Sequence, residues 1–270
     1  MKAESIRNFQ SHVYAFYRGN RREFPWRQTH DPYYILVSEM MLQQTQVERV
    51  IPKYLSFVAN FPDFAALASA TPGDVVREWQ GLGYNRRAIY LHRIARRVMD
   101  CYGGSLPENE EALRGLPGIG KATAAAIMAF AYGRPSILIE TNIKAVFIHC
   151  FFPKDVRVTD REITRLVELT LDRSNPRDWY YALMDLGTVL KRKNGNPTRR
   201  SVHYQRQSPF QGSDRQIRGR ILDILRESPE IKIDHILLRL DTDPERTRGL
   251  LARLEREGFL EISGETVRMT

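Results

Sequence analysis

Two glutamates of this 270-residue chain lie beside runs of apolar residues, where carboxyl groups are uncommon. Glu39 precedes Met40-Met41-Leu42, and Glu140 follows Ile137-Leu138-Ile139. Burying a carboxylate costs free energy, so each side chain requires a structural partner or a functional role. Two carboxyl groups can also share acid–base work when one carries a proton and the other a charge. We therefore take Glu39 and Glu140 as the first catalytic candidates, with a helix-surface position as the alternative for Glu39.

A glycine-rich turn, Leu116-Pro117-Gly118-Ile119-Gly120, lies twenty positions before Glu140. Its two glycines allow positive φ and close approach of the backbone to another surface. Free N–H groups at the start of the following helix, with Lys121 beside them, are suited to bind a phosphate. We expect Gly118, Gly120 and Lys121 to contact a nucleic-acid backbone, and the turn carbonyls could also hold a monovalent cation (K⁺ or Na⁺). A glycine-rich turn between two packed helices is the alternative.

Most of the net charge of +9 lies in one stretch, residues 191–220, which has nine Lys or Arg residues and one acid. Its other residues are mostly polar or glycine and cannot build a core. This composition is typical of a surface that follows a nucleic-acid backbone. The candidate phosphate contacts are Lys191, Arg192, Arg199 and Arg200. A solvated basic linker explains the charge equally well.

The composition, 42% hydrophobic and 27% charged, is that of a globular protein, and no apolar run approaches the roughly 20 residues of a membrane helix. The N-terminus lacks the features of a secretory signal, so we expect a cytoplasmic protein, associated with the nucleoid if the source is prokaryotic. Cys101 and Cys150 are the only cysteines, and the six histidines are scattered. We expect two buried thiols and no metal site.

Apolar residues recur at helical spacing through residues 1–190, and Gly and Pro punctuate them frequently, which predicts short helices in an all-α fold. Residues 109–131 have the pattern of two helices joined by the glycine-rich turn. After the basic stretch, residues 213–270 predict three helices, the third capped by Asp243-Pro244 and stopped by Gly258, followed by a hairpin over 260–269. This is winged-helix order. The arginines of the third helix alternate with glutamates, so a docking or structural role is as well supported as DNA reading.

Several motifs of the chain, in their order, resemble those of the adenine DNA glycosylase branch of the helix-hairpin-helix glycosylase superfamily. The most specific is Ser38-Glu39-Met40-Met41-Leu42-Gln43-Gln44-Thr45. The others are Phe24-Pro25-Trp26-Arg27, Pro32-Tyr33, Trp79-Gln80-Gly81-Leu82-Gly83-Tyr84, Leu116-Pro117-Gly118-Ile119-Gly120 and Met184-Asp185-Leu186-Gly187. The resemblance covers about residues 20–190.

The resemblance implies two helical subdomains with the DNA lesion in the cleft between them. We expect a six-helix barrel over 28–134 and a second subdomain from 1–27 and 135–212, followed by a winged-helix-like module over 213–270. Relatives hold an iron–sulfur cluster on four cysteines after the segment matched by Met184-Asp185-Leu186-Gly187. Two cysteines cannot supply that set, so no iron–sulfur cluster is expected. Relatives also append a domain that reads 8-oxoguanine, and nothing here resembles it.

By the same resemblance, Glu39 protonates the extruded purine, Glu140 stabilises the cationic sugar and Asn142 orients either Glu140 or the sugar. Glu140 replaces an aspartate of the family. The resemblance further implies a base pocket and residues that probe or wedge the duplex. The pocket residues are Trp26, Arg27, Met40 and Leu42, and the probing residues are Gln43, Gln44 and Tyr84.

Ala122 stands where relatives that also cut the strand carry a nucleophilic lysine, so we expect base removal without efficient strand cleavage. The sequence thus predicts a monofunctional DNA glycosylase of base excision repair that acts on duplex DNA with a mispaired or damaged base, with adenine as the first choice. One alternative is a glycosylase for a deaminated or alkylated base or a mismatched pyrimidine. Another is a non-catalytic, regulatory DNA-binding protein that uses the winged helix.

Overall fold

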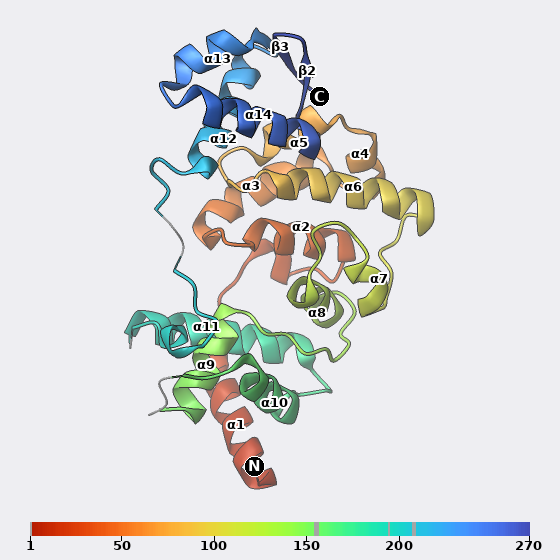
Figure 1. Cartoon of the computed structure of the whole chain (residues 1–270). Helices are drawn as coiled ribbons and strands as arrows, with labels where there is room; N and C mark the ends of the chain where they lie inside the picture. Colours follow the sequence, from red (N-terminus) through yellow and green to blue (C-terminus); the bar gives the residue numbers. More distant parts are fainter. Residues whose placement is uncertain (1, 154–156, 194, 207–208) are drawn as a thin grey trace. The chain divides into compact units, whose positions relative to one another are not determined.

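The computed structural model describes residues 2–153, 157–193, 195–206 and 209–270. This part of the chain is mostly helical, as the spacing of its apolar residues predicts, and the sheet strands lie near the C-terminus (Figure 1). The chain forms two compact units, each built from separate stretches of sequence. The first contains residues 1–39, 107–115 and 119–206, and the second contains residues 40–106, 116–118 and 207–270.

The first unit is a group of packed helices. They are α1 (Ala3–Asn20), the 3₁₀ turn η1 (Pro25–Arg27), most of α2 (Pro32–Leu42), α7 (Glu110–Arg114), α8 (Lys121–Phe130), α9 (Thr141–Phe151), α10 (Asp160–Thr170), α11 (Pro176–Lys193) and the 3₁₀ turn η2 (Pro197–Arg200). Helix α11 packs against α1, α8 and α9, and α10 packs against α1 and α9. Fully buried Val13, Phe147 and Trp179 belong to the core of this unit, so the helices meet along their apolar faces.

The second unit begins with the last three residues of α2 and continues through α3 (Val47–Asn60), α4 (Phe64–Ser69), α5 (Pro72–Trp79) and α6 (Arg86–Cys101). Helix α6 packs against α4 and α5, around buried Phe57 and Trp79. Asp63 and Thr71 each accept a hydrogen bond from a backbone N–H of the helix that follows, which fixes the starts of α4 and α5.

The C-terminal module, residues 213–270, has the predicted succession of elements and one addition. It comprises α12 (Asp214–Glu227), β1 (Glu230–Lys232), α13 (Ile233–Leu240), α14 (Pro244–Glu257), β2 (Leu260–Ser263) and β3 (Thr266–Met269). The sheet is antiparallel in the order β1-β3-β2, and Val267 pairs with both Ile231 and Ile262. The hairpin of β2 and β3 confirms the prediction. Strand β1 was not predicted, because three residues between two helices are too few to show an alternating pattern.

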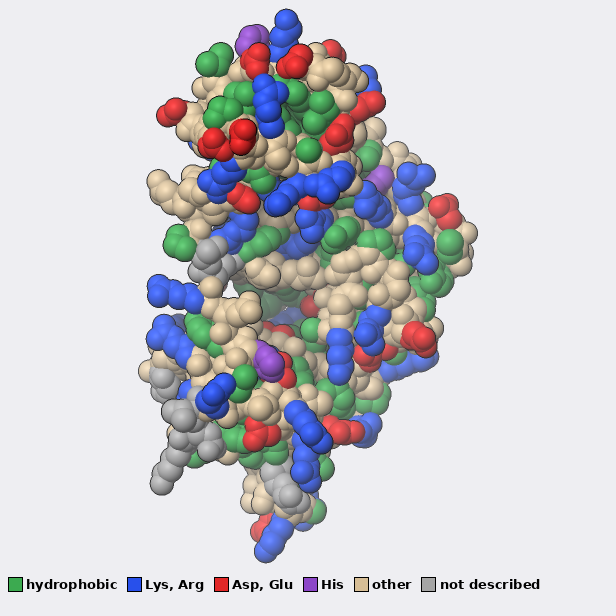
Figure 2. Space-filling view, viewed as in Figure 1, with side chains coloured by type: hydrophobic (Ala, Val, Ile, Leu, Met, Phe, Trp, Pro, Cys, Tyr) green, Lys and Arg blue, Asp and Glu red, His purple; other side chains and the backbone are tan. Residues whose placement is uncertain are grey.

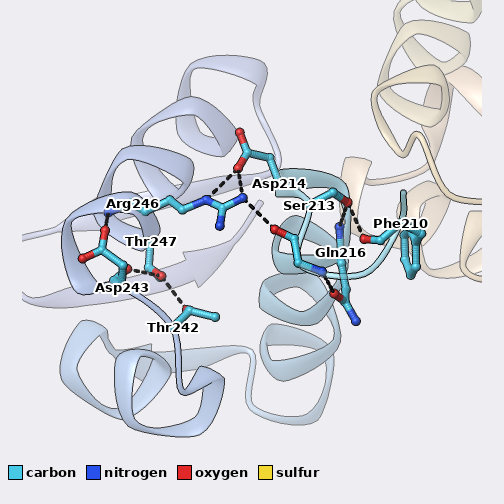
Figure 3. Close-up of polar contacts among 9 residues, drawn as sticks. Phe210, Ser213, Asp214, Gln216, Thr242, Asp243, Arg246 and Thr247 are labelled. Atoms are coloured by element: carbon cyan, nitrogen blue, oxygen red, sulfur yellow. Dashed lines mark hydrogen bonds and ion pairs between the residues drawn. The ribbon is translucent and has the colours of Figure 1, made fainter. Parts of the chain in front are cut away.

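Capping residues define α14 as the sequence predicts. Asp243 accepts a hydrogen bond from the Arg246 N–H at 2.7 Å, and Gly258 ends the helix with a φ of +83°. The Arg246 guanidinium donates to Asp214 and to the Gly212 carbonyl (Figure 3). Figure 2 shows acidic and basic side chains next to one another on the visible face of this module. Arg239, Arg246 and Arg268 of this module form surface ion pairs with Glu227, Asp214 and Glu261. The winged-helix classification of the module stays a prediction.

Two further expectations have different outcomes. Cys101 and Cys150 are both exposed, so the expectation of buried thiols is wrong; they lie at the C-terminal ends of α6 and α9, beyond the last buried residues of those helices, Val98 and Ile148. The expected domain boundaries (28–134, 1–27 with 135–212, and 213–270) stay predictions. No helix in the described residues is long and apolar enough to cross a membrane.

Candidate active site

Glu39 lies in the last turns of α2, between buried Ser38 and buried Met40. Its partly buried carboxyl group has a pKa raised to about 8, chiefly because burial disfavours the charged form and then because the charge of Glu140 opposes it. The positive charge of Arg27 acts in the opposite direction. A carboxyl group with this pKa keeps its proton at neutral pH, which is the state that a general acid requires.

Glu140 is the N-cap residue of α9. Its Oε1 accepts hydrogen bonds from the backbone N–H groups of Asn142 at 2.7 Å and of Ile143 at 2.9 Å, and its Oε2 accepts one from the Asn142 side-chain amide at 3.2 Å. Burial raises the pKa of Glu140, while these hydrogen bonds and the charge of Lys191 act to lower it. Helix N-terminal N–H groups favour a negative charge, so the charged form of Glu140 is stabilised where it stands.

The two carboxyl groups belong to the same compact unit and interact, because the charge of Glu140 raises the pKa of Glu39. Two coupled carboxyl groups lose their protons one after the other. Burial raises the pKa of both groups, but Glu140 has hydrogen-bond donors on both carboxylate oxygens and a nearby Lys191 charge, so we assign the charge to Glu140 and the proton to Glu39. This division can supply a proton to a leaving group and a negative charge to a developing cation.

Arg27, expected in the base pocket, forms a buried ion pair with Asp185 of α11. Its two terminal nitrogens donate to the Asp185 carboxylate at 2.8 and 2.9 Å, and Arg22 donates to the same carboxylate at 2.6 Å. The Arg27 guanidinium also stacks over the Tyr181 ring, 4.3 Å from its centroid. Trp26 is buried and stacked on Phe24. Asp185 therefore fixes Arg27, whose positive charge acts to lower the pKa of Glu39. This role of Asp185 could not be assigned from the sequence.

The loop after α2 contains the residues expected to probe the duplex. Gln44 is exposed and has a φ of +56°, while Gln43 is partly buried. Met40, expected in the base pocket, is fully buried, and Leu42 is partly buried. Positive φ at a residue other than glycine costs about 1 kcal/mol or more and is found disproportionately at functional sites.

A second residue of this kind is Tyr84, which has a φ of +48°. Its hydroxyl accepts a hydrogen bond from Arg215 of α12 at 2.6 Å. Buried Arg87 binds both the loop after α2 and the loop that contains Tyr84. It donates to the carbonyls of Gln43 at 2.6 Å and of Gly83 at 2.8 Å. Burial lowers the pKa of Arg87 to about 10, so it stays charged at neutral pH. Sequence reasoning missed Arg87, because most of its partners are backbone carbonyls.

In the glycine-rich turn, Gly118 has a φ of +75°, and a side chain there would collide with the ring of Tyr90. Gly120 is instead the N-cap of α8 in extended conformation, with a φ of −86°. Lys121 and Ala122 are both exposed at the start of α8. The turn therefore presents the N-terminus of α8 with a lysine beside it, as expected from the sequence.

The four basic residues expected to contact phosphates differ in surroundings. Arg192 and Arg199 are exposed. Arg200 donates to the carbonyls of Ile148, at 3.2 Å, and of Phe152, so it binds the C-terminal end of α9. Lys191 donates to the Asn142 side-chain oxygen at 3.2 Å. Residues 194, 207 and 208 of the basic stretch lie outside the described part of the chain.

Within the described residues, no group of three or more His, Cys, Asp or Glu side chains could hold a metal ion. An iron–sulfur cluster like that of the relatives would need four cysteine thiolates. The chain has two cysteines, one in α6 and one in α9. These residues do not fit an iron–sulfur cluster, and no step of the chemistry is assigned to one.

Comparison with known proteins places this site in a family. Residues 37–170 match the family of HhH-GPD superfamily base excision DNA repair proteins. An adenine DNA glycosylase of Mycolicibacterium smegmatis is 32% identical over 93% of this chain and 92% of its own length. A thymine/uracil-DNA glycosylase of Methanothermobacter thermautotrophicus is 31% identical over 67% of this chain and 84% of its own length.

Among solved structures, a thermostable thymine-DNA glycosylase is 29% identical and superposes with a TM-score of 0.62, covering 69% of this chain and 87% of that one. The matched region contains Glu39, the glycine-rich turn and Glu140, and the similarity to the mycobacterial enzyme extends over nearly the whole chain. This chain therefore belongs to the helix-hairpin-helix superfamily of base excision DNA glycosylases, in the branch of the adenine DNA glycosylases.

Proposed function

We propose that the protein removes mispaired adenine from duplex DNA by hydrolysing its N-glycosidic bond, with Glu39 as general acid and Glu140 as the charge that stabilises the sugar cation. The observation that carries the proposal is the carboxyl pair itself. The pKa of Glu39 is raised to about 8, and Glu140 is held at a helix N-terminus by three donors. The similarity to adenine DNA glycosylases over most of the chain supports the choice of base.

The chemistry requires both groups. An adenine anion leaves poorly, and protonation of a ring nitrogen makes it a better leaving group. As the bond lengthens, positive charge develops on the sugar, where a fixed carboxylate stabilises it and directs the attacking water. Asn142, which donates to Glu140, would keep that carboxylate in place.

Glutamate at position 140 fits the observed geometry. The carboxylate reaches two backbone N–H groups of α9 with one oxygen and the Asn142 amide with the other. The additional methylene is accommodated by this cap, so we infer that Glu140 performs the role of the family aspartate. Asn142 and Ile143 supply the backbone donors that fix it.

We propose that the protein lacks efficient strand-cleaving activity. An amine that attacks the sugar is required for the Schiff-base route, and position 122 holds an alanine. Lys121 is the adjacent residue, but one residue along a helix turns the side chain by roughly 100°. The expected product is an intact strand with an abasic site, which alkali then cleaves.

DNA contacts would come from both units. We assign wedging and probing to Gln43, Gln44 and Tyr84, and phosphate contacts to Gly118, Gly120, Lys121, Arg192 and Arg199. The positive φ of Gln44 and Tyr84 supports functional strain at those two positions. The same proposal includes a K⁺ or Na⁺ ion on the carbonyls of the glycine-rich turn and the domain boundaries given above. It also assigns the base pocket to Trp26, Arg27, Met40 and Leu42. We also propose that the enzyme is cytoplasmic, at the nucleoid in a prokaryote.

A second candidate function is removal of thymine or uracil from mismatches. The relative named a thymine/uracil-DNA glycosylase and the structure of a thymine-DNA glycosylase both match two thirds of this chain or more. A pyrimidine makes less use of a ring-protonating acid, so the raised pKa of Glu39 favours a purine.

A panel of duplexes tests these functions. Each contains one labelled base: adenine opposite guanine or 8-oxoguanine, thymine or uracil opposite guanine, hypoxanthine, or an alkylated purine. Products are resolved with and without alkali. We expect alkali-dependent cleavage at adenine and little cleavage without alkali. Release of thymine or uracil alone would establish the second candidate, and binding without abasic product on any duplex would establish a non-catalytic DNA-binding protein.

A further inference from the structure

Lys191 reaches the candidate active site through a chain of two hydrogen bonds. Its ammonium group donates to the Asn142 side-chain oxygen at 3.2 Å, and the Asn142 amide nitrogen donates to Glu140 Oε2 at 3.2 Å. Lys191 lies in the last turn of α11, and Asn142 lies in the first turn of α9. All three residues belong to the first compact unit.

Close packing of the two helices makes this contact possible. A methyl group added at Gly187 would lie under 3.0 Å from three atoms of Asn142, two of them backbone atoms. The α11 backbone at Gly187 therefore lies directly against Asn142. Residue 191 follows one turn later on the same face of the helix, so the Lys191 side chain extends over the same neighbour.

The chemistry of the donors fixes the orientation of the amide. An ammonium group only donates hydrogen bonds, so it faces the oxygen of Asn142 and turns the amide nitrogen toward Glu140. The Glu140 carboxylate only accepts hydrogen bonds and selects the same amide orientation, so loss of the ammonium group removes one of the two partners that hold the Asn142 side chain. The Lys191 charge also acts on Glu140 directly and lowers the pKa of that carboxyl group.

We propose that Lys191 is a positioning residue that orients Asn142 and thereby holds the Glu140 carboxylate in its working geometry. The inference rests on the proposed function, in which Glu140 is the charged carboxylate. It replaces the expectation that Lys191 is one of the phosphate contacts of the basic stretch. Lys193, two residues later in the same last turn of α11, is exposed and provides a matched control.

The experiment compares Lys191→Met, Lys191→Arg and Lys193→Met with the wild type, each checked for folding by circular dichroism. Base release is measured in single turnovers at saturating enzyme from pH 5 to 9, and the Kd for the duplex is measured at several salt concentrations. We expect Lys191→Met to lower the maximal rate by about tenfold or more, since displacement of a catalytic group by about 1 Å can cost a hundredfold. Its acidic limb should move to higher pH, because Glu140 loses a nearby positive charge.

Lys193→Met should show the opposite pattern. Removal of this exposed charge should leave the maximal rate and the pH profile unchanged, with any effect confined to the Kd and its salt dependence. Lys191→Arg should retain much of the rate, because it keeps a charged donor. If Lys191→Met weakens only the Kd, with an unmoved pH profile, Lys191 is a phosphate contact and the proposal is wrong.

A readout without catalysis separates this proposal from the proposed function. The Glu140 carboxyl carbon is titrated by ¹³C NMR, with Glu140→Gln for assignment, in the wild type and in Lys191→Met. A higher pKa of Glu140 in the variant, together with faster hydrogen exchange of the Asn142 side-chain amide, supports positioning even if no duplex yields product. Unchanged titration and exchange would overturn the proposal, whatever base the enzyme removes.

Discussion

The end of α2 and the start of α9 present the same side chain, glutamate, in two different backbone environments. Glu39 lies inside a helix, where backbone N–H groups are already bonded to carbonyls, and burial raises its pKa to about 8. Glu140 lies at a helix N-terminus, where free N–H groups bind its carboxylate at 2.7 and 2.9 Å. Position relative to the helix, and not residue type, therefore decides which acid donates a proton and which carries a charge.

The largest expected effect comes from removing the proton donor. Glu39→Gln should lower the single-turnover rate of base release by about a thousandfold, within the range of general acid catalysis. The Kd for the substrate duplex, measured by fluorescence anisotropy, serves as the control and should change little. Full activity of this variant would remove Glu39 from the mechanism.

Glu140→Asp tests the other helix position. We expect a rate loss of about a hundredfold, because the shorter side chain withdraws the carboxylate from the donors and the sugar by roughly 1 Å. The measurement is the same single-turnover assay, with Glu140→Gln alongside to show the rate without any charge. An aspartate variant as fast as the wild type would mean that the site does not depend on the longer side chain.

The free energy of unfolding should also depend on the raised pKa of Glu39. The pKa of Glu39 is about 8 in the folded chain and near 4.5 in the unfolded chain, so between these values the unfolded chain releases a proton that the folded chain keeps. Raising the pH from 5 to 8 therefore destabilises the wild type relative to Glu39→Gln, by an amount on the order of 2 kcal/mol. Urea denaturation at both pH values measures it. Parallel pH dependences of the two proteins would contradict the raised pKa.

The smallest of these effects is the pH dependence of the wild-type rate. Because Glu39 must be protonated, the rate should fall above pH 8, by about tenfold between pH 8.5 and 9.5. Deprotonation of Glu140 should produce the acidic limb. Single-turnover rates across this range test it, with DNA binding followed at each pH, and a rate still constant at pH 9.5 would show that the acid is another group.

The sequence was sufficient to predict the helices, the glycine-rich turn and the hairpin of β2 and β3, because each has a local pattern. It also drew attention to Glu39 and Glu140 as carboxyl groups beside apolar runs. The helix cap at Glu140 could also have been predicted from the sequence, since an acid before a helix is a common N-cap.

Other features depend on contacts between distant segments and could not be read locally. Arg87 binds backbone carbonyls at Gln43 and Gly83, and backbone groups carry no sequence signature. Lys191 looked like one cation among nine, and only the close packing of Gly187 on Asn142 shows its partner. The exposure of Cys101 and Cys150 likewise depends on which face of a helix the neighbouring elements cover.

The most direct test of the account is a ¹³C NMR titration of the glutamate carboxyl carbons in the free enzyme, with Glu39→Gln and Glu140→Gln for assignment. We predict that one carboxyl group titrates near pH 8, that its signal is absent from Glu39→Gln, and that Glu140 is already charged at neutral pH. Removal of the Glu140 charge should lower the pKa of Glu39, because that charge is one of the two causes of its rise. Titration of Glu39 near pH 4 to 5, like an ordinary glutamate, would contradict the assignment of proton and charge to the two helices.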